Sequence, residues 1–401
     1  MRRHVLKSHR KTVFEALGRH PIHPFPARMS PGIALDALSE SDEPLRVLDP
    51  MSGSGTVLAV AKANGHHAIG IDIDPLAVLL ARVWTRPTDP DCVRDKAAEV
   101  LGRAKTRFQN LKLARAYPHK SDEETQAFIR YWFDDHARRQ LSALASCIRR
   151  VENSAVREAL WCGFSRLIIT KQAGASLAMD LSHSRPHKTF SKAPINPFDR
   201  FCTAVDTVVS NCPQIGKSSV GPRVRLTQGD ARKLDVRSDS IDLVLTSPPY
   251  LNAIDYMRCS KFSLVWMGHT IGELRQIRAG SVGTEAALEE ASNAQWVATA
   301  IKHLRLKPAL SDQHRAILSR YVWDMSRALS EVARVLRRGG RAVYVVGDST
   351  CRGTFIRNSS IVAAMAERHG LQIASRHSRA LPANRRYLRR SAKSVRGCLA
   401  N

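Results

Sequence analysis

The segment from residue 46 to residue 85 constrains the fold more than any other part of the chain. It reads "RVLDPMSGSGTVLAVAKANGHHAIGIDIDPLAVLLARVWT", and two short apolar runs, 46–48 and 68–71, alternate with helix-compatible runs that begin at Thr56 and Pro75. Short apolar runs bounded by glycine and polar residues are typical of buried strands. Strands that alternate with helices predict an α/β protein with a parallel sheet and helices on its faces.

Later segments continue this alternation. Two further strands are predicted by "VRLTQGDARKL" (224–234) and "IDLVLTSPPY" (241–250), and a helix, a turn and a strand by "YVWDMSRALSEVARVLRRGGRAVYVVGDS" (321–349). A helix near 360–369 and a last strand at 371–377, "LQIASRH", complete the series. The whole pattern predicts a doubly wound, mostly parallel sheet.

Two blocks interrupt the alternation. Residues 87–222 are helix-compatible up to about residue 180 and then become rich in Ser, Pro and Lys, so we expect a largely helical insertion. A second block, at about 258–310, has no clear period, and we expect it to be irregular.

The chain is strongly basic, with 62 Lys and Arg against 36 Asp and Glu and a formal net charge of +26. Such a surplus predicts a polyanionic partner such as a nucleic acid, and the alternative is a solvated basic surface. The eight cysteines include no C-x-x-C pair, so we expect free thiols and no metal site. We also expect a cytoplasmic protein without a membrane span, because no apolar run is long enough for one.

The glycine turn in "VLDPMSGSGT" predicts a ligand site. A strand ends at Asp49, and Gly53 and Gly55 permit a tight turn that brings the backbone close to a ligand at the N-terminus of the next helix. Asp72 follows at the end of the second strand, where a carboxylate can hold the hydroxyls of a ribose. The dinucleotide fingerprint G-x-G-x-x-G is not met, because residue 58 is Leu, which argues against a dehydrogenase.

"DPMSGSGT" resembles the "DPFxGSGT" signature of S-adenosylmethionine-dependent amino-methyltransferases of nucleic acids, with Met51 in place of Phe. The resemblance implies a Rossmann-like methyltransferase fold with S-adenosylmethionine as cofactor. It assigns the ribose to Asp72, the adenine ring to Ile73, the adenine amino group to Asp230 in "QGDA", and the methionine tail to Phe25 in "HPFPARM". The complete expected cofactor set is Phe25, Asp49, Pro50, Gly53, Gly55, Thr56, Asp72, Ile73, Asp230 and Ala231.

"TSPPY" stops an apolar strand with two prolines, which have a fixed φ and make the following loop stiff. An exocyclic base amine is a poor nucleophile, and hydrogen-bond acceptors aimed at its N–H groups take up the positive charge that develops during transfer. The Ser247 side chain and the Pro248 carbonyl are two such acceptors, and the Tyr250 ring offers a face for a base taken out of the duplex. The motif resembles the catalytic [S/D/N]-P-P-[Y/F/W] of the same family, which assigns catalysis to Ser247, Pro248, Pro249 and Tyr250.

The resemblance favours double-stranded DNA as substrate, and Ser in the first position of the motif favours cytosine N4. Adenine N6 is the alternative, whereas cytosine C5 is excluded because that chemistry uses a Pro-Cys dipeptide and none occurs. Two rivals stay open, an RNA methyltransferase and a catalytically inactive DNA-binding protein on the same scaffold. A cognate restriction endonuclease is a possible partner, and no oligomeric state is indicated.

The expected organisation has four parts. Residues 1–86 hold the N-terminal motif and the cofactor half, and 87–222 form the helical insertion, either a target-recognition region or a cap over the cofactor. Residues 223–375 hold the catalytic half with an insertion at about 263–318, and 376–401 form a basic tail. Such folds normally close with a further strand, and 382–401 contain no apolar segment for it, which favours the inactive rival.

Overall fold

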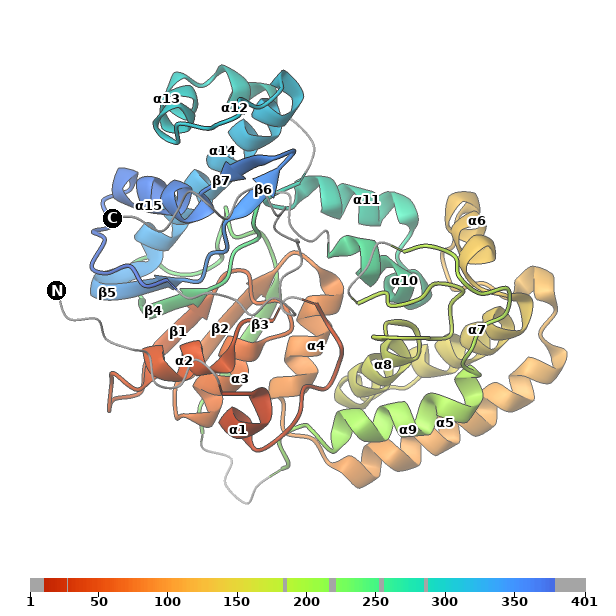
Figure 1. Ribbon diagram of the computed structural model, residues 1–401. Coiled ribbons are helices and arrows are strands. Elements are labelled where there is room, and N and C mark those ends of the chain that lie inside the picture. Colours follow the sequence, from red (N-terminus) through yellow and green to blue (C-terminus); the bar gives the residue numbers. More distant parts are fainter. Residues whose placement is uncertain are drawn as a thin grey trace.

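The computed structural model describes residues 11–26, 28–182, 186–215, 221–251, 256–284 and 288–378 (Figure 1). Its centre is a five-stranded sheet in the order β3-β2-β1-β4-β5, in which every neighbouring pair is parallel. The strands are β1 (Arg46–Asp49), β2 (His67–Asp72), β3 (Val224–Gln228), β4 (Ile241–Thr246) and β5 (Leu336–Tyr344). The predicted α/β, Rossmann-like fold is confirmed.

Helices cover both faces of this sheet because side chains along each strand alternate between the faces. Val47, Leu243 and Leu245 pack with α2 (Pro31–Leu38) and α3 (Thr56–Ala63) in one core cluster. Leu48 and Val244, the neighbours of those residues in the chain, pack on the other face with Val332 and Val335 of α14 (Asp312–Val335). The central strands β1 and β4 are therefore buried on both sides.

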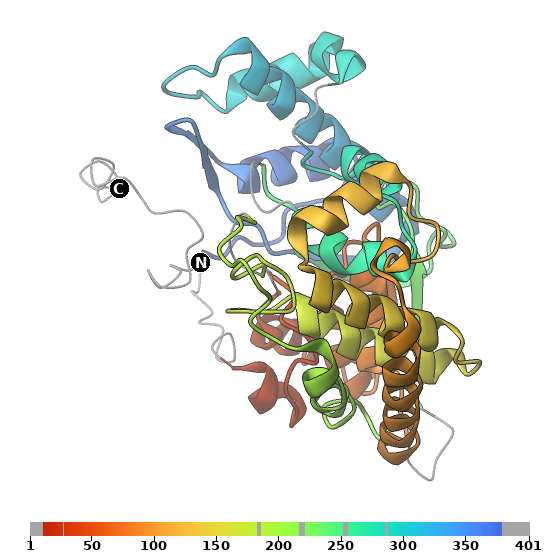
Figure 2. The ribbon, with the colours of Figure 1, turned by 90° about the vertical axis from the view of Figure 1, so that its right-hand side faces the viewer.

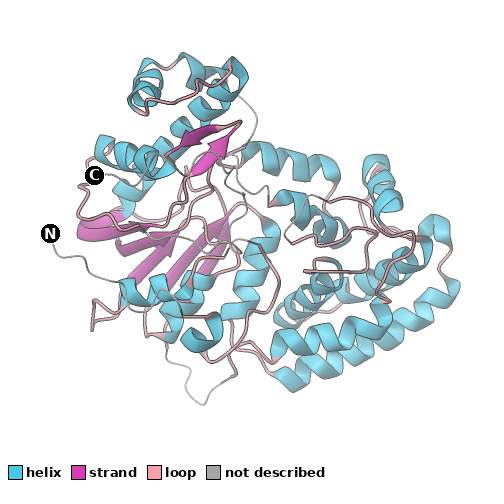
Figure 3. Cartoon of the chain, in the orientation of Figure 1, coloured by secondary structure: helices cyan, strands magenta, loops and turns pink. Residues whose placement is uncertain are grey.

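A block of helices lies beside the sheet and contributes most of the largest core cluster (Figures 1 and 3). Its members are α5 (Pro90–Asn110), α6 (Glu123–Trp132), α7 (Asp135–Arg149), α8 (Ser154–Ile168) and α9 (Pro197–Val209), with the short 3-10 helix Leu113–Arg115 between α5 and α6. We call α5 to α9 the helical block. α4 (Pro75–Thr85) joins it to the sheet, because Leu76, Leu80 and Trp84 belong to the same cluster.

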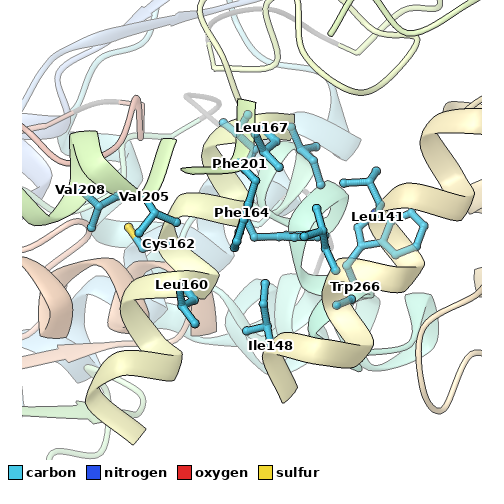
Figure 4. Packing of buried hydrophobic residues seen from close by; sticks show 14 of the residues in the cluster. Leu141, Ile148, Leu160, Cys162, Phe164, Leu167, Phe201, Val205, Val208 and Trp266 are labelled. Atoms are coloured by element: carbon cyan, nitrogen blue, oxygen red, sulfur yellow. The ribbon is translucent and has the colours of Figure 1, made fainter. Parts of the chain in front are cut away.

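The helical block is completed by a helix from the second half of the chain. Trp266 of α10 (Met257–Met267) packs with Leu141 of α7, Phe164 of α8 and Phe201 of α9 (Figure 4). α11 (Ile271–Gly280) follows α10 and is bound to the block by a hydrogen bond from the Ile271 N–H to Thr125 Oγ1. Across the residues that the structure describes, no helix is both long and apolar enough to cross a membrane.

The expected irregular block at 258–310 is wrong for most of its length. It contains α10, α11, α12 (Glu289–Asn293) and α13 (Gln295–His303), of which the last two pack near α14. The helical periods in this stretch are short and broken by Gly268, Gly280 and Gly283, so the sequence showed no sustained period. A small antiparallel hairpin, β6 (Ser349–Cys351) and β7 (Thr354–Ile356), and α15 (Asn358–Arg368) follow β5, and α1 (Val13–Leu17) precedes α2.

The expected strand at 371–377 is also wrong, since no strand lies there. Gly370, with a φ of 78°, ends α15, and the Leu371 N–H donates to the Ala366 carbonyl. Leu371 packs against the core, whereas residues 372–378 are exposed, so the chain leaves the sheet surface after one apolar contact. A strand needs an unpaired sheet edge as well as apolar residues, and only the latter can be read from "LQIASRH". Of the expected basic tail at 376–401, residues 376–378 are exposed, and residues 379–401 lie outside the described residues.

Two glycines in the helical block give a matched test of its packing. A Cβ on Gly163 of α8 would lie 2.5 Å from Val205 Cγ2 and 3.0 Å from Val205 Cα, whereas one on Gly102 of α5 would meet nothing within 4 Å. We expect Gly163→Ala to lower the free energy of unfolding by about 1–3 kcal/mol through overpacking. Gly102→Ala should raise it by about 0.5–1 kcal/mol, because alanine stabilises a helix interior. Urea titrations of both variants measure this, and equal effects of the two changes would contradict the close α8–α9 contact.

Candidate active site at the carboxyl ends of β1, β2 and β4

A pocket lies where the carboxyl ends of the central strands meet. It brings together twelve of the residues expected from the sequence, and those residues are Phe25, Asp49, Pro50, Gly53, Thr56, Asp72, Ile73, Asp230, Ala231, Ser247, Pro249 and Tyr250. The glycine turn and the Ser-Pro-Pro-Tyr loop, about 200 residues apart in the chain, therefore line one cavity. Gly55 and Pro248 are not among the lining residues, and both are buried.

Gly55 has a packing role in the structure. It precedes α3 with a φ of 84°, and a Cβ on it would lie 2.7 Å from Ala81 Cβ on α4. Glycine is thus required there both by the backbone conformation and by the approach of α3 to α4. Gly53, with a φ of 49°, faces the pocket, and its N–H donates to Asp72 Oδ2 at 2.7 Å.

Three hydroxyl groups of the glycine turn lack a protein partner within the described part of the chain. They are the buried side-chain oxygens of Ser52, Ser54 and Thr56, at the N-terminus of α3. A buried polar atom without a partner is costly, and a helix N-terminus attracts negative charge. Together these groups fit a ligand carboxylate or phosphate at this end of the pocket. Ser52 and Ser54 were not expected as site residues, although "SGS" in the motif carries them.

Three carboxyl groups, those of Asp49, Asp72 and Asp74, also line the pocket. Burial raises the pKa of Asp49 to about 7, although Thr246 Oγ1 donates to it at 2.7 Å. Burial likewise raises the pKa of Asp74 to about 7, although a hydrogen bond of 2.6 Å from Ser260 Oγ acts to lower it. Burial also raises the pKa of Asp72. A cationic group in this part of the pocket would favour the ionised form of all three.

Asp230 lines the pocket but is already held by Arg232. The guanidinium donates to Oδ1 from Nε at 3.0 Å and to Oδ2 from Nη2 at 2.7 Å. Burial opposes ionisation of Asp230, but these hydrogen bonds outweigh it and lower its pKa. Any contact between Asp230 and an adenine amino group therefore uses a carboxylate that is ionised and fixed in place.

Arg232 also fixes the wall that faces the sheet. It donates from Nη1 to Asp324 Oδ1 of α14 at 2.6 Å and from Nη2 to the Gly280 carbonyl at the end of α11. Arg320 donates to the same aspartate at 3.3 Å and to the Ala279 carbonyl at 3.0 Å. Residues 278 and 280–284 line the pocket, so this network holds one wall in position.

The loop after β4 is held on both sides. Ser247 Oγ donates to the Val345 carbonyl at 3.0 Å and lies 3.4 Å from Tyr250 OH, so one of its two lone pairs stays available to a further donor. Tyr321 OH donates to the Pro249 carbonyl at 3.0 Å. The Tyr250 ring lies on Gly347, where a Cβ would be 2.7 Å from the ring. A stiff loop with an open oxygen acceptor and an aromatic ring therefore borders the pocket.

Other lining residues were missed by the sequence analysis. Tyr256 precedes α10, and its ring stacks on Phe25 with centroids 5.9 Å apart and planes 3° apart. Met29, Met257 and the wall at 278–284 reach the pocket only through the tertiary fold. Their local sequence carries no motif, and only the aromatic character of Tyr256 so soon after "TSPPY" was a usable signal.

Comparison with known proteins finds distant relatives over most of the chain. The chain is 21% identical over 397 residues to type II methyltransferase M.MvaI of Kocuria varians, which covers 91% of this chain and 85% of the relative. It is 22% identical over 379 residues to type II methyltransferase M.AvaI of Anabaena variabilis, with coverage of 82% and 73%. Type II methyltransferase M.MjaII of Methanocaldococcus jannaschii is 20% identical over 325 residues, with coverage of 59% and 60%. No protein-family model matches the chain.

The fold and the similarities agree. A parallel five-stranded sheet carries the glycine turn and the Ser-Pro-Pro-Tyr loop at one edge, and the distant relatives share a single class of activity. The chain is distantly similar to type II DNA methyltransferases over most of its length, and the fold and the pocket are consistent with that similarity.

Proposed function

We propose that the protein transfers a methyl group from S-adenosylmethionine to the exocyclic N4 amine of cytosine in duplex DNA. The observation that carries this proposal is that the Ser247 hydroxyl and the glycine turn with its unpartnered hydroxyls line the same pocket. The proposed substrate also agrees with the net charge of +26, since DNA is a polyanion.

The residues of the pocket fit the cofactor. Ser52, Ser54 and Thr56 would bind its carboxylate at the start of α3, and Asp72 would accept hydrogen bonds from the ribose hydroxyls. The adenine ring would lie against Ile73, with Asp230 at its amino group. When bound, the cofactor supplies an electrophilic methyl group on a positively charged sulfur, whose charge the carboxylates Asp49, Asp72 and Asp74 complement.

The loop after β4 would prepare the amine for attack. Ser247 Oγ already donates its proton to the Val345 carbonyl, so it faces an incoming amine as an acceptor. Together with the Pro248 carbonyl it would orient the nitrogen lone pair and stabilise the positive charge on nitrogen as the N–C bond forms. The bond between sulfur and the methyl group would break as the N–C bond forms, which would leave a neutral thioether, and the nitrogen would then release one proton to solvent and become a neutral N-methylamino group.

Tyr250 would stack on the base after it leaves the helix. Its ring packs directly on the backbone of Gly347, because glycine has no side chain to separate them. A ring held in this way loses little entropy when a base stacks on it. Pro249, whose carbonyl is bound by Tyr321, would keep the ring in position.

The choice of cytosine N4 over adenine N6 depends on Ser247, the first residue of the motif, and N6-adenine transfer is the alternative. We further propose that residues 87–222 act in target recognition or as a cap, that the enzyme works in the cytoplasm, and that a restriction endonuclease is its partner. An RNA substrate or an inactive DNA-binding protein are the rival functions.

Replacement of Ser247 tests the catalytic assignment. We expect Ser247→Ala to lower kcat by about 10²–10³-fold, the usual effect of removing one hydrogen-bonding group that stabilises transition-state charge, while cofactor affinity is kept. Methyl transfer from labelled cofactor to DNA measures the rate, and mass spectrometry of the digested DNA identifies N4-methylcytosine or N6-methyladenine. Ser154→Ala on the exposed start of α8 is the matched control. Equal rates for both variants would remove Ser247 from the mechanism.

The raised pKa of Asp49 predicts a pH dependence of cofactor binding. With a pKa of about 7, Asp49 is partly protonated near neutral pH, and a bound cation favours its ionised form, so binding releases protons. Cofactor affinity should therefore rise between pH 6 and pH 8, by at most about tenfold per pH unit for each proton released.

Calorimetry in buffers of different ionisation enthalpy measures the released protons. Asp49→Asn should release fewer protons and show a flatter pH profile, whereas Asp42→Asn, an exposed site just before β1, should behave like the wild type. A profile that is unchanged in Asp49→Asn would show that Asp49 does not titrate on binding.

A further inference from the structure

The β6–β7 hairpin, which follows β5 in the chain, exposes an aromatic side chain. Its strands pair antiparallel over Ser349–Ile356, Thr350–Phe355 and Cys351–Thr354. Because faces alternate along a strand, Cys351 and Ile356 are buried under the hairpin, whereas the Phe355 side chain is 49% exposed. The outward face of the hairpin therefore presents the Phe355 ring to solvent, where a partner can reach it.

The turn of this hairpin carries an arginine in a conformation that does not favour it. Arg352 and Gly353 are its two central residues, with φ values of 48° and 87°. A two-residue turn with both φ positive favours Asn-Gly or Asp-Gly, and glycine occupies only the second position here. A long side chain in the first position costs stability, and the exposed Arg352 guanidinium at the tip is available to a partner outside the fold.

The hairpin is fixed relative to the Ser-Pro-Pro-Tyr loop. Asn358 Nδ2 donates to the Gly347 carbonyl and to Ser349 Oγ, both at 3.0 Å, and Thr354 Oγ1 donates to the Pro308 carbonyl at 2.9 Å. Gly347 in turn lies under the Tyr250 ring. Arg352 is five positions after Gly347 in the chain, so the Cα atoms of these two residues lie within about 17 Å of each other. Figure 2 shows the hairpin extending outward from the helices beside it.

We propose that the tip of the β6–β7 hairpin is a contact site for the DNA duplex beside the extruded base. Arg352 binds a backbone phosphate, and Phe355 packs against the nucleotides that the extruded base leaves behind. The inference rests on the proposed function and deepens it. DNA is the occupant that the charge favours, since Arg352 and Arg357 flank the exposed ring in a chain of net charge +26.

Arg352→Asn separates DNA binding from folding, because we expect it to weaken DNA binding while it keeps or raises the melting temperature. Asparagine tolerates a positive φ, so the variant should melt at the same temperature as the wild type or higher. Its affinity for duplex DNA should fall about three- to tenfold, with a salt dependence of log Kd smaller by about one counterion. Lys120→Asn replaces another exposed cation, at a φ of 63°, and controls for the backbone effect on stability.

Phe355→Thr tests the aromatic contact, since threonine keeps the strand propensity of this exposed position. We expect kcat/KM to fall about tenfold on a duplex oligonucleotide and to stay unchanged on a single strand of the same sequence, whose base needs no extrusion.

Unchanged duplex affinity in Arg352→Asn, or equal losses on duplex and single strand in Phe355→Thr, would overturn the proposal. So would a change of oligomeric state in sedimentation with DNA binding intact, because the hairpin would then be a protein contact. Failure of the proposed function is distinguishable, since the wild type would then bind duplex DNA without transferring a methyl group.

Discussion

The hydrogen bond between Thr246 Oγ1 and Asp49 Oδ1 joins the two halves of the pocket. Each residue is the last of its strand, and the glycine turn begins directly after one and the Ser-Pro-Pro-Tyr loop directly after the other. Neighbouring parallel strands lie about 4.8 Å apart, so two motifs almost 200 residues apart start from adjacent points. Both side chains are nearly inaccessible to water, and the Thr246 hydroxyl partly offsets the burial that raises the pKa of Asp49. The spacing between cofactor turn and catalytic loop is thus set by the sheet.

The opposite wall depends on Arg232. This guanidinium contacts a carboxylate beside the pocket, a carboxylate on α14 and the last carbonyl of α11. Burial lowers its pKa, but the two carboxylates outweigh that effect and raise it. Asp324 is 1% exposed, and loss of either partner would leave a buried charge, which is strongly destabilising. Arg232 therefore links the wall at 280–284 to the loop that holds Asp230, and a displacement of one would displace the other.

Local patterns sufficed to predict the elements that carry the pocket. The alternation at 46–85 gave β1, α3, β2 and α4 to within a residue or two, because each element is short, apolar and punctuated by glycine or proline. Whether residues 371–377 form a strand, and whether residues 257–303 form helices, depends on which sheet edge or helix face is available to pack against. That availability is a property of the assembled fold and cannot be read from a local pattern. For the same reason Tyr256 and the 280–284 wall escaped prediction, whereas Gly55 was predicted as a ligand contact from a motif in which it serves helix packing.

Local rules hold at the helix starts near the sheet, since α4, α5, α6, α7, α8 and α9 all begin with an Asp or Asn whose side chain caps backbone N–H groups. Other positions break local rules. At the pocket these are the unpartnered hydroxyls of Ser52, Ser54 and Thr56 and the buried Asp49 beside Asp72, and away from it they include Lys120, Arg305 and Arg352 at positive φ. Each costs stability, and a fold tolerates such costs where function compensates for them. The three unpartnered hydroxyls at 52–56 lie in one turn that lines the pocket, so they support its assignment as a ligand site independently of the resemblance.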